Sequence, residues 1–117
     1  MIKKTIIAFS LLSVIAAFSS WAHAKLQSST PADHAQLTEA PKSLMLQFDE
    51  PAKLARLLLT MADKEIPVAV DKSAKASQTF SITLPGLAPG KYQVQWTAVA
   101  ADDGHVTKGA FDFTIAG

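Results

Sequence analysis

The sequence predicts an all-β protein, a Greek-key β-sandwich of about seven strands. Three observations predict this fold class: short segments in which apolar and polar residues alternate, turn residues between those segments, and the absence of a long run with the 3.6-residue apolar period of a helix. One face of each alternating segment is expected to be buried and the other wet, as in antiparallel sheets. The chain has 117 residues, enough for one domain.

The alternating segments are the expected strands. They are residues 43–49, 79–84, 92–97 and 111–115. A more continuous apolar run at 56–61 suggests a strand buried on both faces, and Leu26 begins a short first strand that runs through Ser28. We expect a short helical turn at 51–55, and a loop or a weak edge strand at 71–77.

Two proline-glycine pairs separate the expected strands: Pro85-Gly86 ends one, and Pro89-Gly90 opens the next. The segment 87–92 has the spacing of a tyrosine corner, in which a tyrosine hydroxyl reaches back to a backbone group a few residues upstream and pins a Greek-key crossover. We therefore expect such a bond from the hydroxyl of Tyr92.

The N-terminal segment has the order of a secretory signal peptide. A short basic head is followed by apolar or small residues from 5 to 18. This run is shorter than the roughly 20 residues that span a bilayer, and no later stretch approaches that length. The mature chain is therefore not expected to insert into a membrane.

Two cleavage sites fit the small-residue rule. Cleavage after Ala22 releases a chain that starts at His23, and cleavage after Ala24 releases one that starts at Lys25. Sequence rules alone slightly favour the second site.

Charge and composition exclude several functions. The formal net charge is +1, and loss of the signal peptide removes two lysines, so a near-neutral mature chain has no electrostatic reason to bind nucleic acid. The absence of cysteine rules out a disulfide and a thiol nucleophile. The sequence also has neither a Gly-x-Ser-x-Gly nucleophile elbow nor a phosphate-binding glycine loop.

The segment Asp103-Gly104-His105 holds a carboxylate and an imidazole two residues apart, and it is expected in a loop at one end of the sandwich. Residues two apart in an extended segment point to the same side, and Gly104 leaves the backbone free to adjust. Asp103 and His105 could therefore close on one metal ion. The same residues also fit a solvated turn rich in aspartate and glycine.

A mature chain that starts at His23 would add two nitrogens to this pair, the α-amine and the imidazole. With His105 and Asp103, the set becomes three nitrogens and one oxygen, which suits Cu(II), and zinc remains possible. If His23 is discarded with the signal peptide, this set does not form.

The remaining histidine and the methionines are assigned no ligand role. His34 lies in a turn-like segment and is expected to be a surface histidine. Met45 is expected on the polar face of its strand and Met61 at the margin of the core.

The mature chain resembles the CopC family of periplasmic copper-binding proteins, and the resemblance runs from His23 to the C-terminus. The segments that carry it are His23-Ala24-Lys25-Leu26, Ser29-Thr30-Pro31-Ala32-Asp33, Ala40-Pro41-Lys42-Ser43-Leu44, Leu46-Gln47-Phe48, Leu87-Ala88-Pro89-Gly90-Lys91-Tyr92 with Val94 and Trp96, and Asp103-Gly104-His105 with Lys108-Gly109. Their order and spacing together are specific, although no single segment is.

The resemblance implies a cupredoxin-like or immunoglobulin-like sandwich and a mature chain that starts at the histidine. Residues 1–22 are then the signal peptide, and 23–117 are the copper-binding domain. It also implies one Cu(II) per chain, with His23, Asp103 and His105 as the metal ligands.

This sequence departs from the family in two places. A Cu(I)-binding methionine-rich loop with histidine would lie between residues 60 and 77, where this chain has only Met61 and no histidine, so no Cu(I) methionine site is expected. Lys25 also replaces the histidine that the family often has at the third mature position.

The leading interpretation is a monomeric periplasmic protein, not an enzyme, that captures, buffers or delivers Cu(II) in copper homeostasis or resistance. The resemblance implies an inner-membrane copper transporter of the CopD type as its partner. Two alternatives remain. One is a copper-brace oxidative enzyme of the monooxygenase kind, and the other is a metal-free β-sandwich interaction module.

Overall fold

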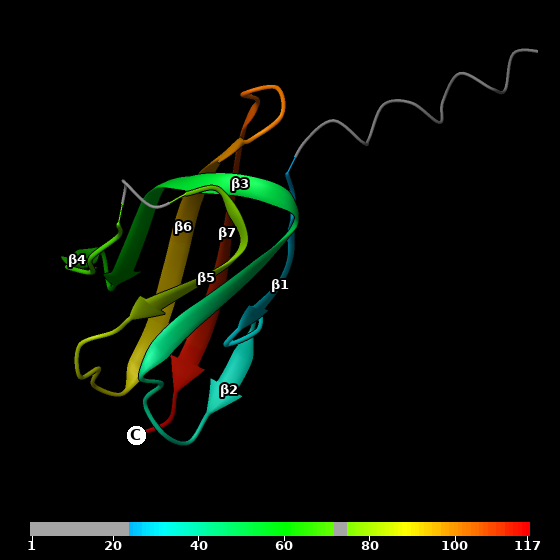
Figure 1. The fold of residues 1–117 in the computed structure, drawn as a ribbon. Coiled ribbons are helices and arrows are strands. Elements are labelled where there is room, and N and C mark those ends of the chain that lie inside the picture. The colour runs from blue at the N-terminus through cyan, green and yellow to red at the C-terminus, as the bar shows by residue number, and fades with distance from the viewer. Residues whose placement is uncertain (1–23, 72–74) are drawn as a thin grey trace, which may run out of the picture.

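In the computed structural model, residues 24–71 and 75–117 are described, and they form seven β-strands. The strands are β1 (Leu26–Thr30), β2 (Ala35–Leu37), β3 (Ser43–Met61), β4 (Lys64–Ile66), β5 (Ser77–Thr83), β6 (Gly90–Ala100) and β7 (Val106–Ile115) (Figure 1). The all-β prediction is confirmed. The predicted signal peptide and His23 lie outside the described residues. In the part of the chain that is described, no helix has the length and apolar character needed to cross a membrane.

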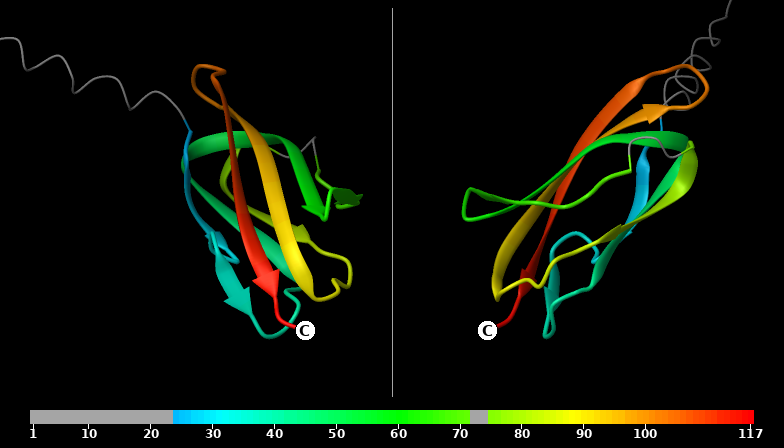
Figure 2. Two further views of the ribbon diagram at one scale, coloured as in Figure 1. Left: turned by 180° about the vertical axis from the view of Figure 1, so that it is seen from behind. Right: turned by 60° about the vertical axis from the view of Figure 1, so that its left-hand side comes forward.

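The long strand β3 belongs to both layers of the sandwich. Its first part, through Phe48, pairs antiparallel with β1 and with β5. Its second part, from Ala52 to Met61, pairs antiparallel with β6, and its end also pairs with β4. The path continues from β6 to β7 and then to β2, the one parallel pairing among the described strands. Figures 1 and 2 show β3 arching across one end of the molecule between the two layers.

Two predictions about the second part of β3 are wrong. Residues 51–55 do not form a helical turn but continue the strand, because Ala52 pairs with Ala100 of β6 and faces the core. Residues 56–61 are not buried on both faces: Leu57 and Leu59 are buried on one face of the strand, whereas Arg56 on the other face is exposed.

The core lies between the layers and is built from the inward faces of the alternating strands. Phe48 of the first layer packs edge-on against Trp96 of the second, with ring centroids 5.2 Å apart. Tyr92 stacks on Phe113 at 5.3 Å. The Tyr92 side chain is only 1% exposed, and its hydroxyl donates a 2.5 Å hydrogen bond to the carbonyl of Ala88. The predicted tyrosine corner is therefore confirmed.

Other expectations are also confirmed. The first strand begins at Leu26 and runs to Thr30, two residues beyond its predicted end. Met45 is 39% exposed on the outer face of β3, and Met61 packs against the margin of the core. The short strands β2 and β4 were not predicted, because three residues are too few to show alternation.

The packing of Trp96 against Gly109 gives a test of this core. The two residues are register partners, and a Cβ added to Gly109 would lie 2.5 Å from Cζ2 of the indole. We expect Gly109→Ala to displace the ring and to lower the free energy of unfolding by about 1–3 kcal/mol. Urea denaturation at an unchanged slope, together with the Trp96 emission maximum, measures the effect.

Gly86→Ala is the matched control, because an added Cβ there meets nothing within 4 Å. Equal denaturation midpoints for Gly109→Ala and Gly86→Ala would contradict the close packing of the indole on β7.

Candidate metal centre

The predicted ligands Asp103 and His105 lie in the loop between β6 and β7, at the end of the sandwich where β3 arches over (Figure 1). Backbone bonds fix this loop: the Ala100 N–H donates to the His105 carbonyl at 2.8 Å, and the Gly104 N–H donates to the Ala100 carbonyl at 3.1 Å. Gly104 has a φ of 73°, in the left-handed region that glycine adopts without strain. A third bond, from the Ala101 N–H to the Pro51 carbonyl at 3.0 Å, ties the loop to β3.

The structure brings the Asp103 and His105 side chains into direct contact, as their spacing predicted. Oδ2 of Asp103 lies 2.8 Å from Nδ1 of His105, and Oδ1 accepts the His105 backbone N–H at 3.0 Å. The backbone N–H first, and the imidazole second, hold the pKa of the Asp103 carboxyl below its ordinary value. The pair therefore presents an ionised carboxylate beside an imidazole, at a partly exposed position.

The start of the described chain is anchored at the same end of the sandwich. Ala24 is fully buried, and its carbonyl accepts a 2.7 Å hydrogen bond from the Thr107 hydroxyl. The next residue, Lys25, donates its backbone N–H to Oδ1 of Asp49 at 2.7 Å and accepts the Asp49 N–H at 2.9 Å. Ala24 and Lys25 therefore lie next to the strand that leads out of the Asp103–His105 loop.

The predicted ligand His23 lies outside the described residues. The residue after it, Ala24, is bonded to Thr107, two positions along the chain from His105. The bonds of Ala24 and Lys25 could not be found from local sequence, because their partners are distant along the chain.

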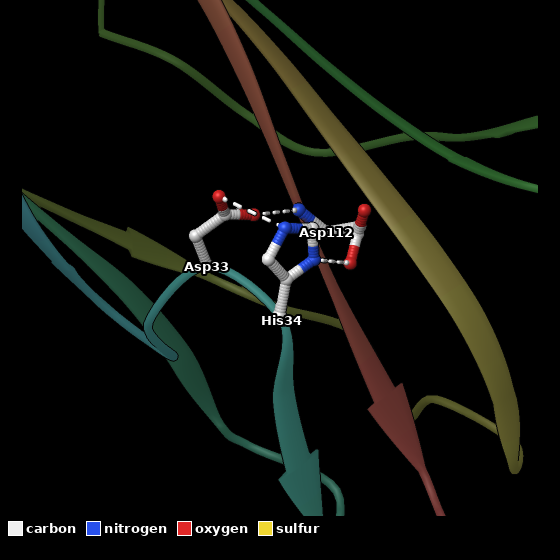
Figure 3. Close-up of side chains that lie close together, drawn as sticks. All are labelled: Asp33, His34 and Asp112. Carbon is white, nitrogen blue, oxygen red and sulfur yellow. Dashed lines mark hydrogen bonds and ion pairs between the residues drawn. The ribbon is translucent and has the colours of Figure 1, made fainter.

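A second cluster of ligating groups lies elsewhere on the molecule and contains Asp33, His34 and Asp112 (Figure 3). Within the described ranges, one nitrogen or oxygen atom from each of these residues lies within 4.8 Å of the others. The His34 side chain is 76% exposed, which confirms the prediction of a surface histidine. Sequence reasoning missed Asp112, because only the parallel pairing of β2 with β7 brings it to His34.

Comparison with known proteins gives consistent relatives. Residues 26–116 match the CopC domain family. Protein YobA of Escherichia coli strain K12 is 32% identical over 102 residues, which cover 83% of this chain and 82% of YobA. Copper resistance protein C of Escherichia coli is 34% identical over 111 residues, which cover 85% of this chain and 86% of that protein.

A solved structure agrees with these relatives. The crystal structure of PcoC, a methionine-rich copper resistance protein from Escherichia coli, superposes with a TM-score of 0.65 at 28% identity. The superposition covers 80% of this chain and 99% of PcoC. The sandwich described above is thus the fold of a known copper resistance protein.

The Asp103–His105 contact predicts how the Asp103 pKa responds to a side-chain deletion. His105→Ala removes the imidazole but keeps the backbone N–H, which is the larger cause of the lowered pKa. We expect the pKa of Asp103 in the metal-free protein to rise but to stay below that of an ordinary aspartate. Carboxyl carbon shifts in a pH titration measure it, with His34→Ala as the control that leaves Asp103 unchanged. A return to the ordinary value in His105→Ala would show that the backbone bond is absent in solution.

Proposed function

The chain belongs to the CopC family, and on that premise we propose that it is a periplasmic Cu(II)-binding protein. The observation that carries the proposal is the contact of Asp103 with His105 in a loop whose next strand, β7, holds Ala24 through Thr107. Cleavage after Ala22 would make His23 the first residue, directly before Ala24 in the chain. The names of the copper resistance relatives support copper as the ion.

The proposed ligands are His23, Asp103 and His105, with one Cu(II) per chain. His23 would supply its α-amine and an imidazole nitrogen, and His105 would supply another imidazole nitrogen. Asp103 can bind through Oδ2 while Oδ1 keeps its bond to the His105 backbone, so the loop need not unfold to bind the ion. Three nitrogens and one carboxylate oxygen form a set that suits Cu(II) among the divalent first-row metals.

The proposed role is to capture, buffer or deliver copper in homeostasis or resistance, without catalysing a reaction. In this proposal residues 1–22 are a cleaved signal peptide, and 23–117 act in the periplasm as a monomer. A CopD-type copper transporter of the inner membrane would be the partner. A Cu(I) site is not proposed, because the chain has three methionines in all, whereas PcoC is described as methionine rich.

Processing is the first test, because the ligand set needs a free α-amine on His23. We expect protein recovered from the periplasm to have the intact mass of a chain that starts at His23. A chain that starts at Lys25 would lack both proposed nitrogens of His23 and would rule out this ligand set.

Copper titration tests the ligands and has a built-in reporter. Trp96 is the only tryptophan in a chain that starts at His23, and it is 6% exposed on the strand that leads to the loop. We expect one equivalent of Cu(II) to quench its emission. His105→Ala and Asp103→Ala should each weaken binding by more than the roughly 10-fold typical of lost outer-shell partners, because each removes a direct ligand.

Two controls make this titration decisive. His34→Ala should bind copper like the wild type, because it lies outside the proposed site. A chain with one alanine added before His23 should bind much more weakly, because the backbone nitrogen of His23 is then part of an amide and no longer a free amine. Wild-type affinity in His105→Ala would show that the site is wrong, and peroxide production with ascorbate by the copper-loaded protein would favour the copper-brace enzyme instead.

A further inference from the structure

We propose that Asp33, His34 and Asp112 form a proton-operated latch that fastens the edge strand β2 to β7. Figure 3 shows the His34 ring between the two carboxylates, with Asp33 from the same turn and Asp112 from β7. The latch is independent of copper binding, so its failure would leave the proposed function untouched, and the reverse also holds.

The contacts of the His34 ring indicate which protonation state the latch needs. Nδ1 lies 2.9 Å from Oδ1 of Asp112, and Nε2 lies 3.4 Å from Oδ2 of Asp33. A neutral imidazole has one N–H, so one of the two carboxylates would face a ring lone pair. The imidazolium has an N–H at both nitrogens and can attract both carboxylates.

Backbone bonds place these three side chains at the point where β2 begins. The His34 N–H donates to the Asp112 carbonyl at 2.6 Å, and the Asp112 N–H donates to Oδ1 of Asp33 at 3.1 Å. His34 has a φ of 66°, and the next residue, Ala35, starts β2 opposite Phe113. Because β2 has three residues and is paired only with β7 among the described strands, its hold on the sheet depends heavily on this junction.

The charges around His34 favour its protonated form. The hydrogen bond to Asp112 raises the pKa of His34 most, followed by the charges of Asp112 and Asp33, while Lys91 on β6 opposes them. The folded pKa is therefore above that of the unfolded chain. The stabilisation from the latch is present in full below the unfolded value of about 6.5, and it is lost as pH rises through the folded pKa.

The observed contacts pair each ring nitrogen with its own carboxylate, Nδ1 with Asp112 and Nε2 with Asp33. A proton on each nitrogen satisfies both contacts. A divalent ion is the competing occupant, because one ligand atom from each of the three residues lies within 4.8 Å of the others. A metal titration distinguishes the two occupants.

Two measurements on the metal-free mature protein test the latch. The ring protons of His34 should titrate in the wild type above the ordinary histidine value of about 6.5, and closer to it in Asp112→Asn. The melting temperature of Asp112→Asn should be below that of the wild type by about 1–4 °C at acidic pH, and the difference should shrink at alkaline pH. At acidic pH, amide hydrogen exchange at 35–37 should be faster in this variant.

Glu39→Gln is the matched control, because it also removes one exposed negative charge near β2. It should leave the His34 titration and the exchange at 35–37 unchanged. The latch is wrong if wild-type His34 titrates at the ordinary value, or if Asp112→Asn and Glu39→Gln shift the melting temperature equally at both pH values. A Zn(II) or Cu(II) equivalent that binds the wild type and is lost in His34→Ala would overturn it in favour of a metal site.

Discussion

The passage of β3 through both layers is the constraint on which the rest of the structure depends. The strand changes layer between Phe48, the last partner of β1, and Ala52, the first partner of β6. Asp49 and Pro51 lie in this bend, and each bonds to another segment. Asp49 bonds to Lys25, the residue before β1, and the Pro51 carbonyl accepts the Ala101 N–H of the β6–β7 loop. The bend that closes the sandwich thus also assembles the candidate metal centre.

Sequence patterns predicted the strands that bury one face, because the alternation of apolar and polar residues follows directly from the burial of one face. They failed at 51–55, where helix-compatible residues are drawn into β3 by the pairing of Ala52 with Ala100. Burial of Ala52 and Leu54 outweighs local preference there, as is general for strands whose stability comes from neighbours. The strand β2 could not be predicted for the same reason, because it forms by pairing with β7 and its own three residues carry no strand pattern.

The candidate sites also differ in whether their contacts join residues that are near or distant in the sequence. Asp103 and His105 are two residues apart, so their contact is a local property that the sequence could predict. The Thr107–Ala24 bond spans 83 positions and the His34–Asp112 bond spans 78, so both depend on the completed sheet. The role of His23 stays a prediction, supported by the anchoring of Ala24 and by the resemblance of the sequence to its family.

The two histidine regions should respond to protons in opposite ways. Metal binding by the imidazoles and the amine requires their unprotonated forms, so acid opposes copper, whereas acid completes the latch at His34. The chain from His105 to Asp112 spans about 23 Å in an extended strand, well beyond the Debye length of about 8 Å at physiological ionic strength. Charge at one region is therefore screened from the other. Any coupling between them must pass through the packing of β7, whose first residues hold Ala24 and whose last residues hold β2.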